Sequence, residues 1–255
     1  MTDTDREQPL VSHLIELRSR LLRMIVGILI VFLALLPFAN PIYTVLAGPL
    51  LRHLPAHSSM IAIDVLSPFL TPIKLSLVLA IFITMPWILY QVWAFVAPGL
   101  YQKEKRLALP ILASSALLFY CGMAFAYFVI MPLFFAFVTG TAPEGVAVMT
   151  DISRYLDFVL TLFFAFGIAF EVPVATVILA LAGVITPDAM AAKRPLVLLG
   201  AFVIGAVLTP PDVISQTLLS LPMWLLFEIG VFISRLLLRR RREAHEAATE
   251  STGES

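Results

Sequence analysis

The sequence predicts an all-α, polytopic membrane protein, and three observations support this fold class. Of its 255 residues, 60% are hydrophobic and only 13% are charged, whereas soluble domains carry about a quarter charged residues. The apolar residues gather in runs, most of them long enough to cross a bilayer as a helix. Lys and Arg gather in the segments between alternate runs, as in multi-pass proteins. Little of the chain is left over for a soluble domain.

Six spans are expected, and they form a single membrane domain over residues 1–238. An amphipathic helix at the membrane surface is expected before them, because leucines share one face of residues 12–20. The spans cover about residues 21–38, 73–96, 107–138, 155–181, 195–208 and 214–238.

Two features qualify this arrangement of spans. The run 195–208 has only 14 residues, so it either spans a locally thinned bilayer or forms part of a re-entrant hairpin. Prolines 86, 132, 173 and 222 lie inside the apolar runs, and kinked helices favour a concave bundle. The basic and then acidic tail 239–255 is expected to be disordered.

The positive charges predict the orientation. Fourteen of the 17 Lys and Arg residues lie in the N-terminal segment, the loops near residues 97–106 and 183–194, and the run Arg235–Arg242. The other side has only Arg52, Lys74 and Arg154. The positive-inside rule therefore places both termini in the cytoplasm.

Glu171 is the first candidate functional residue, because it lies inside the apolar stretch Phe163–Pro173. A carboxylate near the bilayer centre costs roughly 2.5 kcal/mol or more on insertion scales. Gly167 and Ala175 lie on its helical face and would let another helix approach, and Pro173 predicts a kink. The carboxyl either bonds within its own bundle or serves a partner or transport role.

Other polar residues leave alternatives open. Glu16 and Glu104 lie among Arg and Lys at a membrane edge, where each forms a local pair or accepts an arginine from a partner peptide. Thr209 and Gln216 bond either to a neighbouring helix or to water and headgroups. Asp212 is expected to cap the last helix. Glu228 also lies inside an apolar run, so the same two alternatives apply to it as to Glu171, but it lies nearer the cytoplasmic side.

The sequence contains no motif for catalysis or cofactor binding. One cysteine and four histidines without paired spacing argue against a disulfide or a metal site. Neither a phosphate-binding loop nor a nucleophile beside a base is found, so no enzyme activity, cofactor or nucleic-acid partner is expected. The partners left to consider are the lipid bilayer and other proteins.

Five motifs follow one another along the chain: Ser12–Arg20, Tyr90–Glu104, Gly122–Phe128, Phe166–Pro173 and Leu208–Gln216. Together they closely resemble the TatC family, the core subunit of the twin-arginine protein translocase. The resemblance extends from about residue 8 to about residue 238.

The resemblance implies a receptor subunit in the bacterial inner membrane that binds the twin-arginine signal peptides of folded precursors at its cytoplasmic face. It also implies self-association, assembly with the single-span subunits TatA and TatB, and export driven by the proton-motive force. The implied functional positions are Glu16, Arg18, Phe95, Pro98 and Glu104 for the signal peptide, Glu171, Thr209 and Gln216 for the partner helices, and Pro49, Phe69 and Asp212.

A proton-coupled small-molecule transporter that uses Glu171 as its carrier is the alternative. It would be favoured by repeat symmetry between two halves of the chain and by a second intramembrane polar ligand beside Glu171. Neither feature is found in the sequence.

Overall fold

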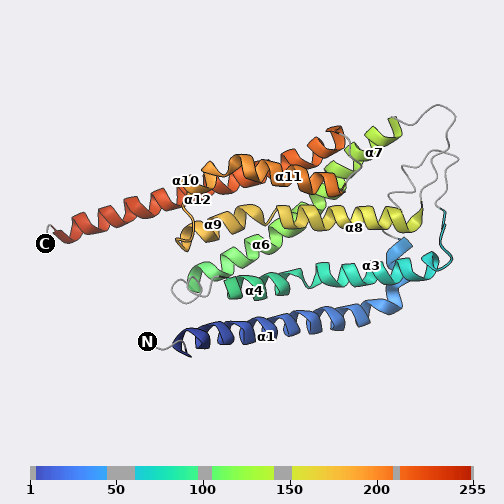
Figure 1. Cartoon of the computed structure of the whole chain (residues 1–255), viewed down its shortest axis with the longest axis horizontal. Coiled ribbons are helices and arrows are strands. Elements are labelled where there is room, and N and C mark those ends of the chain that lie inside the picture. Colours follow the sequence, from blue (N-terminus) through green and yellow to red (C-terminus); the bar gives the residue numbers. More distant parts are fainter. Residues whose placement is uncertain (1–3, 45–60, 97–104, 141–150, 209–212, 254–255) are drawn as a thin grey trace. The chain divides into compact units, whose positions relative to one another are not determined.

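The computed structural model describes residues 4–44, 61–96, 105–140, 151–208 and 213–253. These residues form helices, with an isolated β-bridge between Ile61 and Asp151 (Figure 1). The all-α prediction is therefore confirmed for this part of the chain. The chain divides into two compact units, Met1–Pro98 with Ala142–Leu160 and Gly99–Thr141 with Thr161–Ser255. That residues 1–238 form a single domain stays a prediction.

The first unit is built on a long N-terminal helix. Helix α1 runs without a break over Thr4–Leu35, and the 3₁₀ turn η1 follows at Leu36–Phe38. The expected surface helix and the expected first span, residues 21–38, are thus parts of one helix. Helix α1 packs along α3 (Ser67–Ile83) and α4 (Met85–Val96) (Figure 1).

Helices α3 and α4 form a bent pair that corresponds to the predicted span 73–96. Their axes differ by 53° at Thr84. Pro86 has no N–H to donate to the carbonyl of Phe82, so the helix cannot continue regularly. At the bend, the Thr84 hydroxyl donates to the carbonyl of Ala80 at 2.8 Å. The predicted interruption at Pro86 is confirmed, although the helix begins at Ser67, six residues before the predicted start.

In the second unit, the predicted span 107–138 contains a π-helical turn. Helix α6 (Lys105–Phe125) leads into η2 (Ala126–Ile130) and then α7 (Met131–Gly140). The N–H of Met131 bonds the carbonyl of Ala126, five residues back. The turn directly precedes Pro132, whose missing N–H weakens regular α-helical bonding there, and such bulges are a common way for a helix to accommodate the defect.

The predicted span 155–181 is likewise broken, between α8 (Ile152–Ala169) and α9 (Val172–Leu181). The N–H of Glu171 donates to the carbonyl of Ile168 at 3.0 Å, three residues back instead of four. Pro173 follows in the first turn of α9, where a proline costs no hydrogen bond. The regular α-helical hydrogen bonding is therefore interrupted at Glu171, where the sequence predicted a kink.

The chain ends with α10 (Pro187–Ala192), α11 (Arg194–Leu208) and α12 (Val213–Gly253), and α9, α10 and α11 all pack against α12. Helix α12 passes through Pro222 and extends to Gly253, so the tail for which disorder was expected is helical to that residue. Its Ala and Glu residues favour helix, and Arg239 donates to Glu243 one turn later at 2.9 Å.

Among the described residues, four helices are long and apolar enough to cross a membrane. A fifth span is added if α3 and α4 count as one. Helix α11 is apolar but has only 15 residues, about 22 Å of helix. The chain is therefore a polytopic, all-helical membrane protein, while the count of six spans and the side on which the termini lie stay predictions.

Candidate functional site

The carboxyl of Glu171 lies at the break between α8 and α9 and faces α6. Its Oε2 accepts a hydrogen bond from the hydroxyl of Ser115, a fully buried residue of α6. Its Oε1 is buried and has no hydrogen-bond partner among the described residues. The carboxyl therefore has one oxygen bonded within the second unit and one oxygen without a partner there. Leaving a buried acceptor without a hydrogen bond is energetically costly.

Two glycines allow α6 to approach α8 beside this carboxyl. An ideal Cβ on Gly122 would lie 2.4 Å from the carbonyl oxygen of Phe166, and one on Gly167 would lie 2.5 Å from the ring of Phe119. Both distances are far below a van der Waals contact. The prediction that Gly167 lets another helix come close is therefore confirmed.

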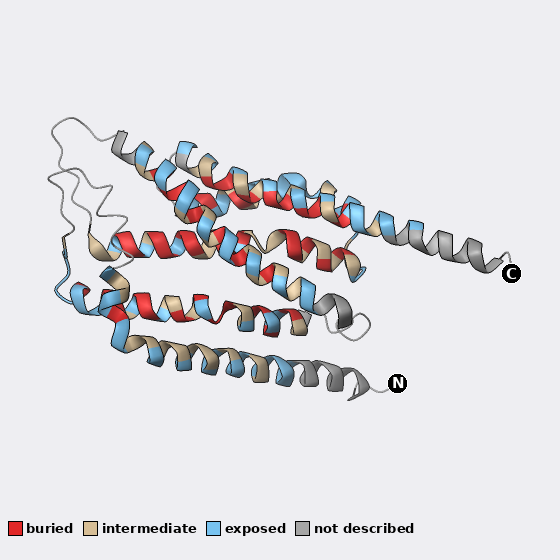
Figure 2. Ribbon diagram, turned by 180° about the vertical axis from the view of Figure 1, so that it is seen from behind, coloured by how far each residue is buried: buried red, intermediate tan, exposed pale blue. Residues whose placement is uncertain are grey.

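Aromatic rings surround the same crossing. Phe119 and Phe166 are almost completely buried. The ring centroid of Phe125 lies 5.6 Å from that of Phe166 and 5.6 Å from that of Phe170, within the range of attractive ring pairs. This apolar packing lies at the crossing of α6 and α8, and Figure 2 shows buried positions along much of α8.

A second carboxylate, Glu16, lies on α1 in the first unit. Both Nε and Nη2 of Arg20 donate to its Oε1, at 2.9 and 2.6 Å. Nη1 of Arg20 donates to the side-chain oxygen of Gln91 on α4 at 3.3 Å, and Gln91 is buried. The local pair that the sequence offered as one alternative is therefore formed. The Glu16 side chain still keeps 47% of its surface exposed.

The structure places only some of the other predicted residues. Arg18 is exposed on α1, Phe95 is half-buried near the end of α4, and Phe69 is exposed in the first turn of α3. Gln216 on α12 donates to the carbonyl of Phe202 on α11 at 2.8 Å, so the alternative of a bond to a neighbouring helix holds for it. Five predicted positions lie outside the described residues: Pro49, Pro98, Glu104, Thr209 and Asp212.

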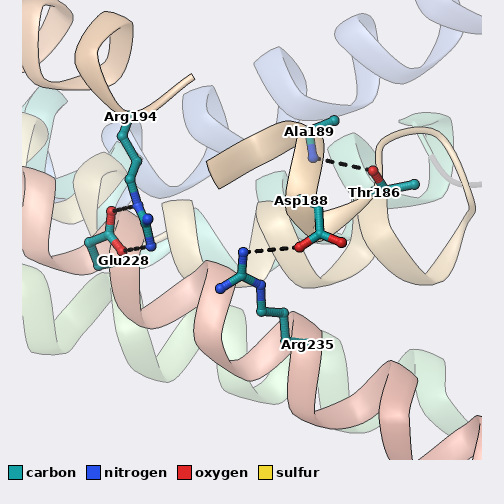
Figure 3. A network of polar contacts seen from close by, with 6 residues as sticks. All are labelled: Thr186, Asp188, Ala189, Arg194, Glu228 and Arg235. Atoms are coloured by element: carbon teal, nitrogen blue, oxygen red, sulfur yellow. Dashed lines mark hydrogen bonds and ion pairs between the residues drawn. The ribbon is translucent and has the colours of Figure 1, made fainter. Parts of the chain in front are cut away.

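Sequence analysis missed two ion pairs that tie the α10–α11 segment to α12 (Figure 3). Arg194 binds Glu228 through two parallel hydrogen bonds of 2.6 and 2.7 Å. Arg235 donates to Asp188 at 3.0 Å. The sequence offered one signal for the first pair: Arg194 directly precedes the short apolar run 195–208, and Glu228 lies inside the last run, 214–238. Glu228 is thus an ion-pair partner here, unlike Glu171.

The fold and these polar groups define a class, a multi-pass helical membrane protein whose in-membrane carboxyl is held by a neighbouring helix. Comparison with known proteins is more specific. A family model described as "Sec-independent protein translocase protein (TatC)" matches residues 12–222.

Relatives of the same name cover nearly the whole chain. The protein from Azotobacter chroococcum mcd 1 is 58% identical, with 95% of each chain covered. The protein from Escherichia coli strain K12 is 58% identical, with 94% of this chain and 93% of the relative covered. A crystal structure of a twin-arginine translocase receptor, TatC, is 41% identical and superposes with a TM-score of 0.79, over 88% of this chain and 98% of the other.

This chain belongs to the TatC family of Sec-independent protein translocase proteins. The family consists of translocase components and is not an enzyme family, which confirms the resemblance inferred from the five motifs. The alternative of a small-molecule transporter finds no support in these comparisons.

Proposed function

We propose that this chain is the receptor subunit of a bacterial twin-arginine translocase and that Glu16 accepts an arginine of the signal peptide. The observation that carries the proposal is the Glu16–Arg20 contact, in which one carboxylate oxygen already binds a guanidinium. Among the described residues, Oε2 of Glu16 accepts no hydrogen bond, so it is available to a second guanidinium. Arginine suits such a site better than lysine because its planar fork donates two bonds in a fixed geometry.

The remaining signal-peptide surface is assigned through family membership. Glu104 would accept the second arginine, and Arg18, Phe95 and Pro98 would belong to the same surface. With both termini in the cytoplasm, as the positive charges predict, this surface faces the compartment in which precursors fold. Of the 17 Lys and Arg residues, 14 lie on that side, which supports the orientation.

The partner helices TatA and TatB would contact Glu171, Thr209 and Gln216 within the bilayer. The buried Oε1 of Glu171 supports this role, because a polar group from a partner helix would satisfy it where water cannot compete. The amide nitrogen of Gln216 is already used by Phe202, which leaves its side-chain oxygen as the acceptor.

Three further positions complete the assignment, with Pro49 and Asp212 proposed on the family alone. Phe69 adds an observation, since a large apolar side chain with 68% of its surface exposed suits contact with lipid, with another copy of the subunit or with cargo. The complex would use the proton-motive force to export folded proteins across the inner membrane, and this chain would hold no cofactor.

Site-specific photo-crosslinking tests the docking assignment. A photoreactive residue at Leu17, which is exposed and adjacent to Glu16, should crosslink a twin-arginine precursor in membranes. The crosslink should disappear with a two-lysine signal and with Glu16→Gln. A probe at Phe232, an exposed residue of α12, is the matched control. Equal crosslinking of both signals at Leu17 would refute the assignment.

A further inference from the structure

A groove lies along α1 where α4 packs against it in the first unit. Its volume is about 640 Å³, and it is a wide, open groove and not an enclosed cavity. The residues that line it on α1 recur at helical spacing, so they form one face. They are Ile15, Arg18, Ser19, Leu22, Arg23, Val26, Gly27 and Ile30, and Trp87 of α4 completes the groove.

Trp87 packs against Gly27 in the apolar part of the groove. The indole N–H of Trp87 donates to the carbonyl of Arg23 at 3.5 Å. A Cβ on Gly27 would be in van der Waals contact with that indole, at 3.4 Å. Because Gly27 has no side chain, the indole packs directly against α1, and Val26 and Ile30 line the groove beside it.

The arginines at the basic end of the groove differ in their partners. Arg20 is neutralised by Glu16. Arg18 and Arg23 are exposed and form no ion pair with any described residue. They lie five residues apart, about 7.5 Å along the helix axis and about 140° around it, so they line opposite edges of the groove. The groove therefore joins two unneutralised guanidiniums to an apolar channel, which suits a molecule with an anionic head and an apolar chain.

We propose that this groove binds an anionic phospholipid. Its phosphate contacts Arg18 and Arg23, since guanidinium groups bind phosphate oxygens through two parallel bonds. One acyl chain follows Leu22, Val26 and Ile30 and lies against the ring of Trp87. Basic pockets between membrane helices are suited to anionic headgroups in this way.

The charge of the groove favours a lipid over a signal peptide as its occupant. The two arginines of a twin-arginine segment have the same sign as Arg18 and Arg23, so they would bind the carboxylate of Glu16 and not these two residues. The inference thus gives Arg18 a partner other than the peptide arginines. It does not depend on the proposed function, because lipid binding is measured without any precursor.

Photolabelling with two lipids tests the proposal. Phosphatidylglycerol and phosphatidylcholine carrying the same photoreactive acyl chain are each added at equal mole fraction to the purified full-length protein, and labelled peptides are identified by mass spectrometry. The phosphatidylglycerol probe should label residues 22–30 roughly tenfold more than the phosphatidylcholine probe. Exposed residues of α11, Leu199 and Val203, report bulk lipid and should be labelled alike by both probes.

Two variants test binding of the lipid phosphate and binding of the acyl chain separately. Arg18→Gln with Arg23→Gln should abolish the preference for phosphatidylglycerol. Gly27→Leu should displace the Trp87 ring that lines the groove and so reduce labelling although both arginines remain. Gly200→Leu is its matched control, because a Cβ on Gly200 meets no atom within 4 Å.

Wild-type protein provides a measurement that needs no variant. Excess unlabelled phosphatidylglycerol should displace the probe from residues 22–30, and excess phosphatidylcholine should not. Equal labelling of residues 22–30 by the two probes would overturn the proposal. So would a preference for phosphatidylglycerol that survives loss of both arginines while α11 labelling is unchanged.

Discussion

The hydroxyl of Ser115 orients the Glu171 carboxyl, because it bonds Oε2 and leaves Oε1 as the free acceptor. Ser115→Ala should lower the free energy of unfolding by about 1 kcal/mol, a magnitude typical of interhelical hydrogen bonds in membranes. If TatA and TatB contact Glu171 as proposed, the variant should also reduce their co-purification, because the carboxyl loses its orientation. Thermal unfolding in detergent and affinity purification measure the two effects.

The neighbouring serine provides the control for this prediction. Ser114 lies on the same helix and donates to the carbonyl of Ile111 at 2.8 Å, so Ser114→Ala removes a hydroxyl without touching Glu171. If both alanine variants lowered partner binding equally, Ser115 would have no specific role in orienting the carboxyl.

At the scale of the elements, close helix packing in the second unit depends on glycines placed at crossings. A Cβ on Gly230 of α12 would lie 2.1 Å from the hydroxyl oxygen of Thr176 and 2.8 Å from Cα of Pro173 on α9. Gly230→Val should therefore force α9 away from α12 and cost about 1–3 kcal/mol of stability, as overpacking does. The midpoint of thermal unfolding measures it.

Gly200→Val is the matched control, since α11 has open space at that position. Both substitutions place a β-branched residue in a helix, so the difference between their losses of stability measures the effect on the α9–α12 contact. Equal loss of stability in the two variants would mean that the α9–α12 contact tolerates the added side chain.

The ion pair between Arg194 and Glu228 holds the start of α11 against α12 (Figure 3). Arg194→Glu or Glu228→Arg alone should lower the unfolding temperature, because each places two like charges together. The double exchange should restore much of the loss, since it recreates an opposite pair. A double exchange that is as unstable as either single variant would show that the pair itself contributes little.

At the scale of the whole molecule, features set by local chemistry could be predicted from the sequence, and those set by distant contacts could not. Pro86 and Pro173 have no N–H to donate to the carbonyl four residues earlier, so a regular α-helix cannot continue through either position and both breaks could be foreseen. Arg194 and Glu228 are 34 residues apart, and their pairing depends on how α11 packs on α12. For the candidate site, the sequence indicated Glu171 and the small Gly167 beside it, but not Ser115, which lies 56 residues away.

The continuity of α1 illustrates a different limit. The polar residues before Leu21 and the apolar residues after it differ in the environment they favour, so composition indicated a boundary there. Both stretches nevertheless favour helix, with good helix formers and no proline between Leu10 and Leu36. The backbone therefore continues through a change of environment, and the same reasoning accounts for the helical extension of α12 to Gly253.

The six-span arrangement rests on α11, whose 15 residues are few for a bilayer crossing. Cysteine labelling decides it. In a variant with Cys121→Ser, Val184→Cys and Val213→Cys place single thiols at exposed positions before and after α11. If α11 spans a locally thinned bilayer, a membrane-impermeant maleimide added outside intact cells should label the thiol at position 213 and not that at position 184. Permeabilised cells, in which both thiols should react, are the control. A thiol at position 213 that reacts only after permeabilisation would favour a re-entrant α11–α12 hairpin, because its tip would then stay within the membrane.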